Sequence, residues 1–177
     1  MFDNTLASIS SDCTIRLWNP INNADYVDEL KETSISCLSC LNQDKSEGVP
    51  SSVDYIKNDK TKIITSFGSS HHTLYDLETS KSILKLDYSE SSRNTHCYKV
   101  LSHPTLANVN SSLVISAHED KKIRFFDLNS GKLINQLVAH QDACTDIAID
   151  PTCFYLLSAS KIFKYFDPKL TKRELFC

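Results

Sequence analysis

Glycine is scarce in this sequence. The 177 residues include three glycines, whereas average usage of about 7% would give about a dozen. A glycine-rich phosphate-binding loop is therefore excluded. Serine, asparagine and aspartate must form the tight turns instead, because their short polar side chains bond to nearby backbone groups.

The chain also lacks an excess of positive charge, because 19 Lys+Arg stand against 22 Asp+Glu, a formal net charge of −3. Domains that bind nucleic acid through bulk electrostatics carry a basic excess, so we expect no nucleic-acid partner. Hydrophobic residues at 41% and charged residues at 23% are typical of a globular chain with a core.

Targeting and membrane signals are absent from the sequence as well. No apolar run approaches the ~20 residues that cross a bilayer, and residues 1–11 have neither the basic segment nor the apolar segment of a signal peptide. We expect no transmembrane segment and a cytoplasmic location. The seven cysteines are odd in number and lack framework spacing, so we expect free thiols.

One motif occurs four times: a small hydroxyl residue, then an aromatic residue followed by Asp or Asn. The pairs are Ser8 with Trp18, Thr65 with Tyr75, Ser116 with Phe126, and Ser158 with Phe166. The two members lie ten residues apart in the first three pairs and eight apart in the fourth. The last two aromatic residues are 40 residues apart, close to the ~40–45 residue period of WD repeats.

The segments around these aromatic residues have the composition of strands. Residues 14–18 and 122–126 are rich in β-branched and aromatic side chains, with apolar residues on both faces. A sheet with two apolar faces must be covered on both sides, as a propeller blade is. We predict an all-β fold of WD-repeat β-propeller blades, incomplete, with about two full blades and two partial ones.

The repeats divide one partial WD-repeat propeller over residues 1–177. Residues 35–41 are predicted as the first strand of the second repeat, and the polar residues 42–60 as an insertion loop. Propellers close with ~4 to 8 blades, so we expect a fragment or truncated form. The predicted repeats are residues 1–20 (partial), 30–87, 96–138 and 140–177 (partial).

The third repeat contains a set of polar residues that could carry chemistry. His96, Ser116, Asp120 and Phe126 match the His, Ser or Thr, Asp and Trp positions of WD repeats, which form a buried hydrogen-bonded network. A catalytic Ser-His-Asp arrangement is the alternative, but a nucleophile would not recur in successive blades. A structural role is favoured.

The same network is incomplete in the other repeats, because the first has no His and the fourth has no turn Asp. Phe126 also cannot donate the N–H that a Trp would supply. Structural network roles are predicted for Ser8, Asp12, Trp18, Thr65, Tyr75, Asp76, His96, Ser116, Asp120, Phe126, Asp127, His140, Ser158, Phe166 and Asp167.

Two short motifs contain residues that bind metals. Cys37 and Cys40 form a CxxC motif, but residues three apart in a strand point to opposite faces, so thiols without a metal are favoured. His71 and His72 are predicted in a solvated turn before Thr73. We therefore expect no metal, no cofactor and no catalytic residue.

Several blocks of the sequence resemble the WD domain of striatins. They are residues 102–106 (Ser-His-Pro-Thr-Leu), 117–120 (Ala-His-Glu-Asp) and 138–143 (Val-Ala-His-Gln-Asp-Ala), with residues 75–80 and 150–151 in the same register. The resemblance covers about residues 6–166, and the order of these blocks is more specific than a generic WD pattern.

The resemblance implies a non-enzymatic scaffold. Striatins are regulatory subunits of type 2A protein phosphatase that assemble the phosphatase with germinal-centre-type kinases and Mob-like proteins. Their coiled-coil and calmodulin-binding regions precede the propeller and are absent from this chain. The candidate partner-binding loop consists of His118, Glu119 and Lys121, since propellers bind through loops.

Three other interpretations remain open. The chain could be a different WD-repeat adaptor, such as a chromatin or ubiquitin-ligase subunit, which its co-purified partners would reveal. It could be a truncated product without independent function. An enzyme built on a propeller would need a convergent set of ionisable groups, and the repeats already account for those present.

Overall fold

The computed structural model describes residues 5–19, 36–43, 45–86, 95–103, 113–150, 152, 154–160 and 164–166, the last three by their backbone. This part of the chain contains β-strands and no helix, and hence no apolar helix long enough to span a membrane. The strands are β1 (Leu6–Ile9), β2 (Ile15–Asn19), β3 (Ser36–Leu41), β4 (Pro50–Ile56), β5 (Asp59–Phe67), β6 (His72–Asp76), β7 (Lys81–Leu86), β8 (Cys97–His103), β9 (Leu113–His118), β10 (Lys122–Asp127), β11 (Lys132–Val138), β12 (Asp146–Ile149), β13 (Leu156–Ala159) and β14 (Lys164–Phe166).

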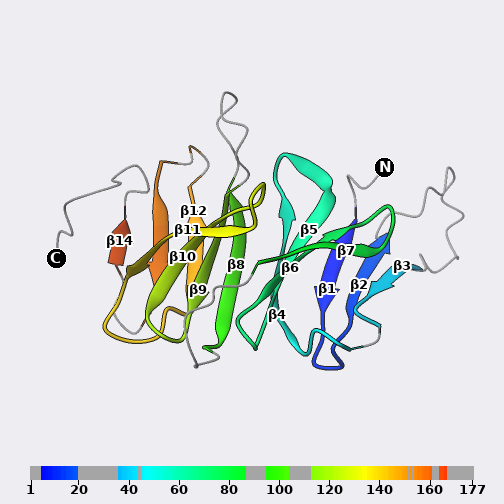
Figure 1. Cartoon of the computed structure of the whole chain (residues 1–177), viewed down its shortest axis with the longest axis horizontal. Helices are drawn as coiled ribbons and strands as arrows, with labels where there is room; N and C mark the ends of the chain where they lie inside the picture. Colours follow the sequence, from blue (N-terminus) through cyan, green and yellow to red (C-terminus); the bar gives the residue numbers. More distant parts are fainter. Residues whose placement is uncertain are drawn as a thin grey trace, which may run out of the picture.

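These strands form four antiparallel sheets that follow one another along the longest axis of the molecule (Figure 1). The first sheet has the order β1-β2-β3 and the second β4-β5-β6-β7; the third is β8 to β11 and the fourth β12-β13-β14. Within each sheet, every strand pairs with the strand that follows it in the sequence, as in a propeller blade. The prediction of an incomplete all-β propeller with two full and two partial blades is confirmed.

The predicted insertion loop at residues 42–60 is wrong. It contains all of β4, which pairs with β5 in the register Val53↔Thr65 and Tyr55↔Ile63. The predicted start of the second repeat at residue 30 is wrong for a related reason, because β3 pairs with β2 through Ile15↔Leu41 and completes the first sheet. β3 is therefore the outermost strand of the first blade, whereas the sequence pattern assigns it to the start of the second.

Three apolar cores fill the spaces between the four sheets. Ile15 and Leu17 of the first sheet pack with Ile63 and Phe67 of the second. In the next core, the second and third sheets contribute Ile56, Ile64, Leu74, Val100, Val114 and Phe126. The third and fourth sheets share Ile115, Ile123, Ile147 and Leu156. Because each sheet packs on its neighbour, a single blade would leave its apolar face exposed.

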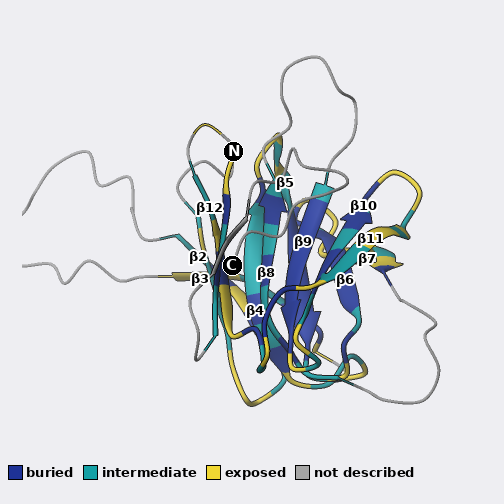
Figure 2. Cartoon of the chain, turned by 90° about the vertical axis from the view of Figure 1, so that its left-hand side faces the viewer, coloured by how far each residue is buried: buried dark blue, intermediate teal, exposed yellow. Residues whose placement is uncertain are grey.

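Burial differs between inner and outer strands of the two complete sheets. In Figure 2, β6 and β9 are mostly buried, while β7 and β11 carry exposed residues along their length. Phe126, at the aromatic position of the repeat in β10, is 0% exposed. Full burial of a phenylalanine side chain stabilises a fold by roughly 1.5–3 kcal/mol.

Polar side chains of β4 join the second and third sheets. The Ser52 hydroxyl accepts a hydrogen bond from the Val100 N–H (3.2 Å), and the Asp54 carboxylate accepts one from the Ser102 N–H (2.9 Å). The Ser102 hydroxyl accepts in turn from the Lys57 N–H (3.2 Å). The serine and aspartate that made this segment resemble a loop therefore serve the contact between two blades.

The β1–β2, β5–β6 and β9–β10 turns each contain a residue with positive φ. Cys13 (φ 72°), Ser70 (φ 75°) and Lys121 (φ 71°) each donate a backbone hydrogen bond to the residue three positions earlier. This left-handed conformation favours glycine, which is absent from all three positions. Local strain at these turns is thus a repeated feature of the fold.

Candidate functional site

The turn between β9 and β10 carries the candidate partner-binding residues. Glu119 and Lys121 are exposed, as an interaction loop requires. His118 is 0% exposed at the end of β9, so the prediction that it belongs to the accessible loop is wrong. Its side chain faces the second sheet, where its ring contacts His72, because alternate residues of a strand point to the same side and Val114 of β9 packs there as well.

This turn is held firmly to its surroundings. The Glu119 N–H donates to the His96 carbonyl (2.8 Å), the Ala139 N–H to the Lys121 carbonyl (2.9 Å), and the Cys144 N–H to the His118 carbonyl (3.0 Å). Three neighbouring segments therefore fix one short turn. The exposed charges of Glu119 and Lys121 are presented on a rigid support.

Asp120, at the centre of the turn, forms an ion pair with Arg124. The Arg124 Nη1 donates to Asp120 Oδ1 (3.0 Å), and Nη2 contacts Oδ2. Arg124 is 1% exposed. A buried guanidinium without its carboxylate would be strongly destabilising, so this pair anchors the turn to β10.

The buried polar network of the third sheet differs from the predicted one. Ser116 bonds to Nε2 of His118 (2.7 Å), two residues along the same strand. His96 is half-buried, and its ring packs edge-on against Tyr98 with centroids 4.7 Å apart. The sequence spacing matched His96 to the network, but the backbone places a nearer imidazole beside the serine.

Predicted network residues bond to one another in the first and fourth repeats. Trp18 Nε1 donates to the Ser8 hydroxyl (2.8 Å), and His140 Nε2 bonds to the Ser158 hydroxyl (2.7 Å). Asp12 accepts from the Thr14 N–H (2.9 Å) and lies in a salt bridge with Arg16. Asp167 and the side chain of Phe166 lie outside the described residues.

The second sheet carries two of the predicted network residues at buried positions. Thr65 is 0% exposed and Tyr75 is 4% exposed. Thr65 Oγ1 has no hydrogen-bond partner within the described part of the chain. This hydroxyl therefore packs in the sheet without the polar pairing that Ser8 and Ser158 have.

Asp76 and Asp127 have the same role in successive sheets. Asp76 accepts hydrogen bonds from the N–H groups of Glu78 (2.8 Å) and Thr79 (2.9 Å). Asp127 accepts from Asn129 and Ser130, both at 3.1 Å. These bonds lower the pKa of both carboxyls, with the Thr79 backbone the largest cause for Asp76 and the Ser130 side chain for Asp127. Both aspartates close the turn to the outer strand.

His71 and His72 do not form the solvated turn that was predicted. His71 stacks on Phe67 with ring centroids 4.7 Å apart, and its Nε2 lies 2.7 Å from Glu47 Oε2. His72 is the first residue of β6 and is 0% exposed. Burial lowers the pKa of His72 to about 3, with His71 and Arg124 adding to the shift.

Two more buried groups lie near His72. Burial lowers the pKa of His118 to about 2 and raises that of the Cys97 thiol to about 12. Both groups are therefore neutral near pH 7. His72, Cys97 and His118 bring their ligand atoms within 4.8 Å of one another.

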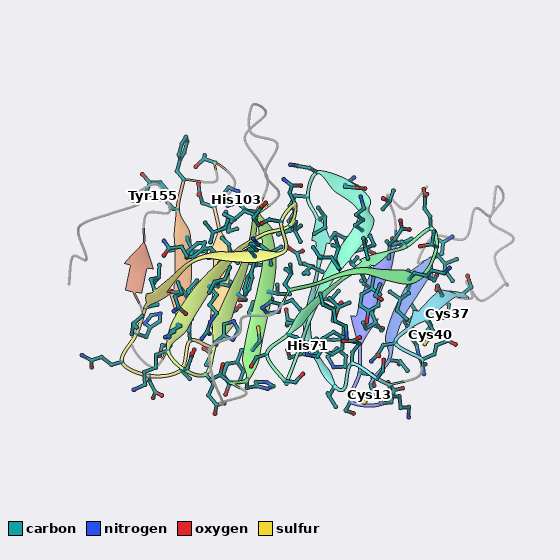
Figure 3. All side chains as sticks on the ribbon, viewed as in Figure 1. Cys13, Cys37, Cys40, His71, His103 and Tyr155 are labelled. Atoms are coloured by element: carbon teal, nitrogen blue, oxygen red, sulfur yellow. The ribbon has the colours of Figure 1, made fainter. Side chains whose placement is uncertain are left out.

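The CxxC pair occupies an edge strand, β3, at the end of the molecule opposite the fourth sheet (Figure 3). Cys37 is exposed and Cys40 half-buried. The Cys37 thiol donates to the Ser39 carbonyl (3.5 Å), and the Cys40 thiol to the Leu41 carbonyl (3.8 Å). The two thiols make separate local contacts.

Known proteins share this arrangement of strands and much of its sequence. Residues 131–161 match the family of the WD domain, G-beta repeat. Human striatin-3 is 42% identical over 160 residues, which are 89% of this chain and 18% of striatin-3. Human striatin is 38% identical over 158 residues, and human striatin-4 is 37% identical over 155 residues. The chain carries a striatin-family WD-repeat region.

The chain spans 18–19% of the length of these relatives. A chain in the crystal structure of the mitotic checkpoint complex superimposes with a TM-score of 0.70 at 14% identity. That match covers 93% of this chain and 45% of the other chain. At this identity it shows the fold alone.

Sequence reasoning missed two groups in this chain. The side chains of Ser52 and Asp54 in β4 bond to the third sheet, and nothing in this polar segment of the sequence indicates that contact. His72 and Cys97 lie 25 residues apart in separate blades. No local spacing could have linked them.

Proposed function

We propose that this chain is a non-enzymatic protein-interaction module in the cytoplasm, part of a striatin-like scaffold that brings a type 2A protein phosphatase together with kinases. The observation that carries this proposal is the 42% identity to human striatin-3 along 160 residues. The phosphatase, germinal-centre-type kinases and a Mob-like protein are the partners that the resemblance suggests.

The turn between β9 and β10 is the proposed contact surface. Glu119 and Lys121 offer two opposite charges on a turn that three backbone hydrogen bonds fix. Val138, which pairs with Lys122 across the neighbouring strand, is 60% exposed and adds an apolar surface beside them. A rigid turn loses little conformational entropy when a partner binds.

The burial of the serine and histidine pairs supports a non-enzymatic role. Ser116 and His118 are both 0% exposed, and His140 and Ser158 are 3% and 1% exposed. A nucleophile and its base must reach a substrate, and a third group must orient the base. These pairs instead lie buried between the sheets.

Binding of purified partners to the 177-residue chain tests the proposal. We expect a type 2A phosphatase core, a Mob-like protein or a germinal-centre-type kinase to bind immobilised chain in biolayer interferometry. Glu119→Gln combined with Lys121→Gly should raise the Kd about tenfold, which corresponds to ~1.4 kcal/mol. Glycine suits the positive φ of Lys121, so the double variant keeps the turn.

A matched control removes the same charges elsewhere. Glu78→Gln combined with Lys81→Gln changes an exposed turn of the second sheet and should leave the Kd unchanged. Equal weakening by both double variants would contradict the assignment of the surface. The absence of binding to all three partners, with binding to histones or a cullin adaptor, would favour another WD-repeat adaptor. Hydrolytic activity of the purified chain would contradict the non-enzymatic role.

A further inference from the structure

Three side chains that bind metals meet between the second and third sheets. They are His72 at the start of β6, Cys97 at the start of β8 and His118 at the end of β9. All three are 0% exposed, and their ligand atoms lie within 4.8 Å of one another. We propose that they bind one thiophilic metal ion with a filled d shell, Zn²⁺ or Cu⁺.

His72 supplies an independent reason to expect a ligand. Among the residues that the structure describes, neither of its ring nitrogens has a hydrogen-bond partner, although the side chain is fully buried. An unsatisfied buried polar group costs roughly 1–3 kcal/mol, and native structures rarely leave one. Coordination through one nitrogen would remove this cost.

The surroundings of His72 restrict what it can contact. Its ring packs edge-on against Phe126, with centroids 5.1 Å apart, and against His118, with centroids 5.7 Å apart. Phe126 offers no hydrogen-bonding group. Cys97 and His118, whose ligand atoms lie within 4.8 Å of a His72 nitrogen, are the other two members of the proposed site.

His118 is positioned by its neighbour on the same strand. The Ser116 hydroxyl bonds to His118 Nε2 at 2.7 Å, and both residues are 0% exposed. Metal-ligating histidines commonly use a bond of this kind to fix the tautomer and the orientation of the ring. Ser116 is thus a positioning residue of the proposed site.

The chemistry of the donor set selects the ion. One thiol and two imidazoles suit Zn²⁺ and copper, whereas Mg²⁺ and Ca²⁺ require oxygen ligands. Binding forms a metal–sulfur bond and releases the thiol proton to solvent. Bonds of ~2.0–2.3 Å place ligand atoms closer than 4.8 Å, so the side chains must approach one another by roughly 1 Å.

Nearby charge distinguishes the two ions. Arg124 acts on His72, Cys97 and His118, and its ion pair with Asp120 offsets its charge. With one thiolate, a Cu⁺ site is neutral, whereas a Zn²⁺ site retains one positive charge that a fourth, anionic ligand would balance. The experiment therefore includes both ions.

Metal titration of the reduced 177-residue chain tests the proposal. We expect one equivalent of Zn²⁺ or Cu⁺ to bind in competition with a chromogenic chelator, and Co²⁺ as a substitute to give thiolate-to-cobalt absorption. X-ray absorption of the wild-type complex should show one sulfur and two nitrogen ligands. This measurement needs no variant, so it remains informative if a substitution prevents folding.

Two sets of variants identify the ligands. Cys97→Ser should weaken binding by at least ~100-fold, since outer-shell partners alone are worth ~10–100-fold. Cys37→Ser combined with Cys40→Ser should leave the affinity unchanged. A two-sulfur ligand shell, or binding lost in the Cys37 and Cys40 variant, would overturn the proposal, as would the absence of stoichiometric binding. A stronger response to one ion identifies which of the two the site takes.

Discussion

Ser116 and His118, two residues apart on β9, are joined by a buried hydrogen bond of 2.7 Å, while the backbone N–H of His96 donates to the Glu119 carboxylate (3.4 Å). This pair replaces the longer-range contact that the repeat pattern suggests. The stability of the third sheet should therefore depend on His118 and Ser116 rather than on the His96 side chain.

Ser116→Ala should lower the free energy of unfolding by ~1–3 kcal/mol, because the buried imidazole of His118 loses its hydrogen bond to the Ser116 hydroxyl. His96→Ala should cost less than ~0.5 kcal/mol, since the His96 side chain is partly solvated. Urea unfolding in the presence of EDTA measures both values without a contribution from metal. A larger loss of unfolding free energy in His96→Ala than in Ser116→Ala would contradict this account.

The hydrogen bond from Trp18 to Ser8 should contribute ~0.5–1.5 kcal/mol to stability. Trp18→Phe removes the donor and Ser8→Ala removes the acceptor, so the double variant should lose less than the sum of the single losses. A double-mutant cycle in urea measures this coupling. Strict additivity would show that the bond adds nothing.

Asp127→Ala should destabilise the chain by about 0.5–1 kcal/mol at pH 7, a value reduced because the carboxylate is largely solvated. The pKa of Asp127 is lowered in the folded state. Its contribution is thus present above the unfolded pKa of ~3.9 and is lost as the pH falls through the folded value. Wild type and variant should converge in acid.

The control for this prediction is Asp127→Asn, which keeps an acceptor oxygen but cannot titrate. Its stability relative to Asp127→Ala should not change with pH. Urea midpoints measured between pH 7 and pH 2.5 give the comparison. A difference between wild type and Asp127→Ala that persists in acid would rule out the carboxylate as its cause.

Lys121→Gly should leave stability unchanged or raise it by ~0.5 kcal/mol, because the residue has a φ of 71°. Lys132→Gly at the start of β11, where φ is not positive, should lower it by ~0.5–1 kcal/mol. Thermal unfolding of the two variants measures whether each substitution raises or lowers stability. A loss at both positions would mean that the turn stores no strain.

The sequence predicted the parts of the fold that repeat. The alternation of apolar residues around Trp18 and Phe126 identified β2 and β10, and their pairing with neighbouring strands follows from the short turns. β4 was missed because Pro50, Ser51 and Ser52 resemble a loop, although Ser52 bonds to the third sheet. A polar residue at a blade contact has no local signature.

The candidate site was predictable to a smaller degree. Glu119 and Lys121 lie in a turn that sequence patterns place correctly, and the His140–Ser158 bond follows from the repeat. His118 was misplaced because its accessibility depends on how the third sheet packs on the second. Contacts between blades depend on tertiary packing, which cannot be predicted from the spacing of residues in the sequence.

The three apolar cores have a consequence for how the chain unfolds. Each apolar core joins two successive sheets, so the stability of a sheet depends on the sheets directly beside it. Phe126 lies in the central core, which is the one of the three that connects the first two sheets with the last two. A break there would divide one cooperative transition into two independent ones.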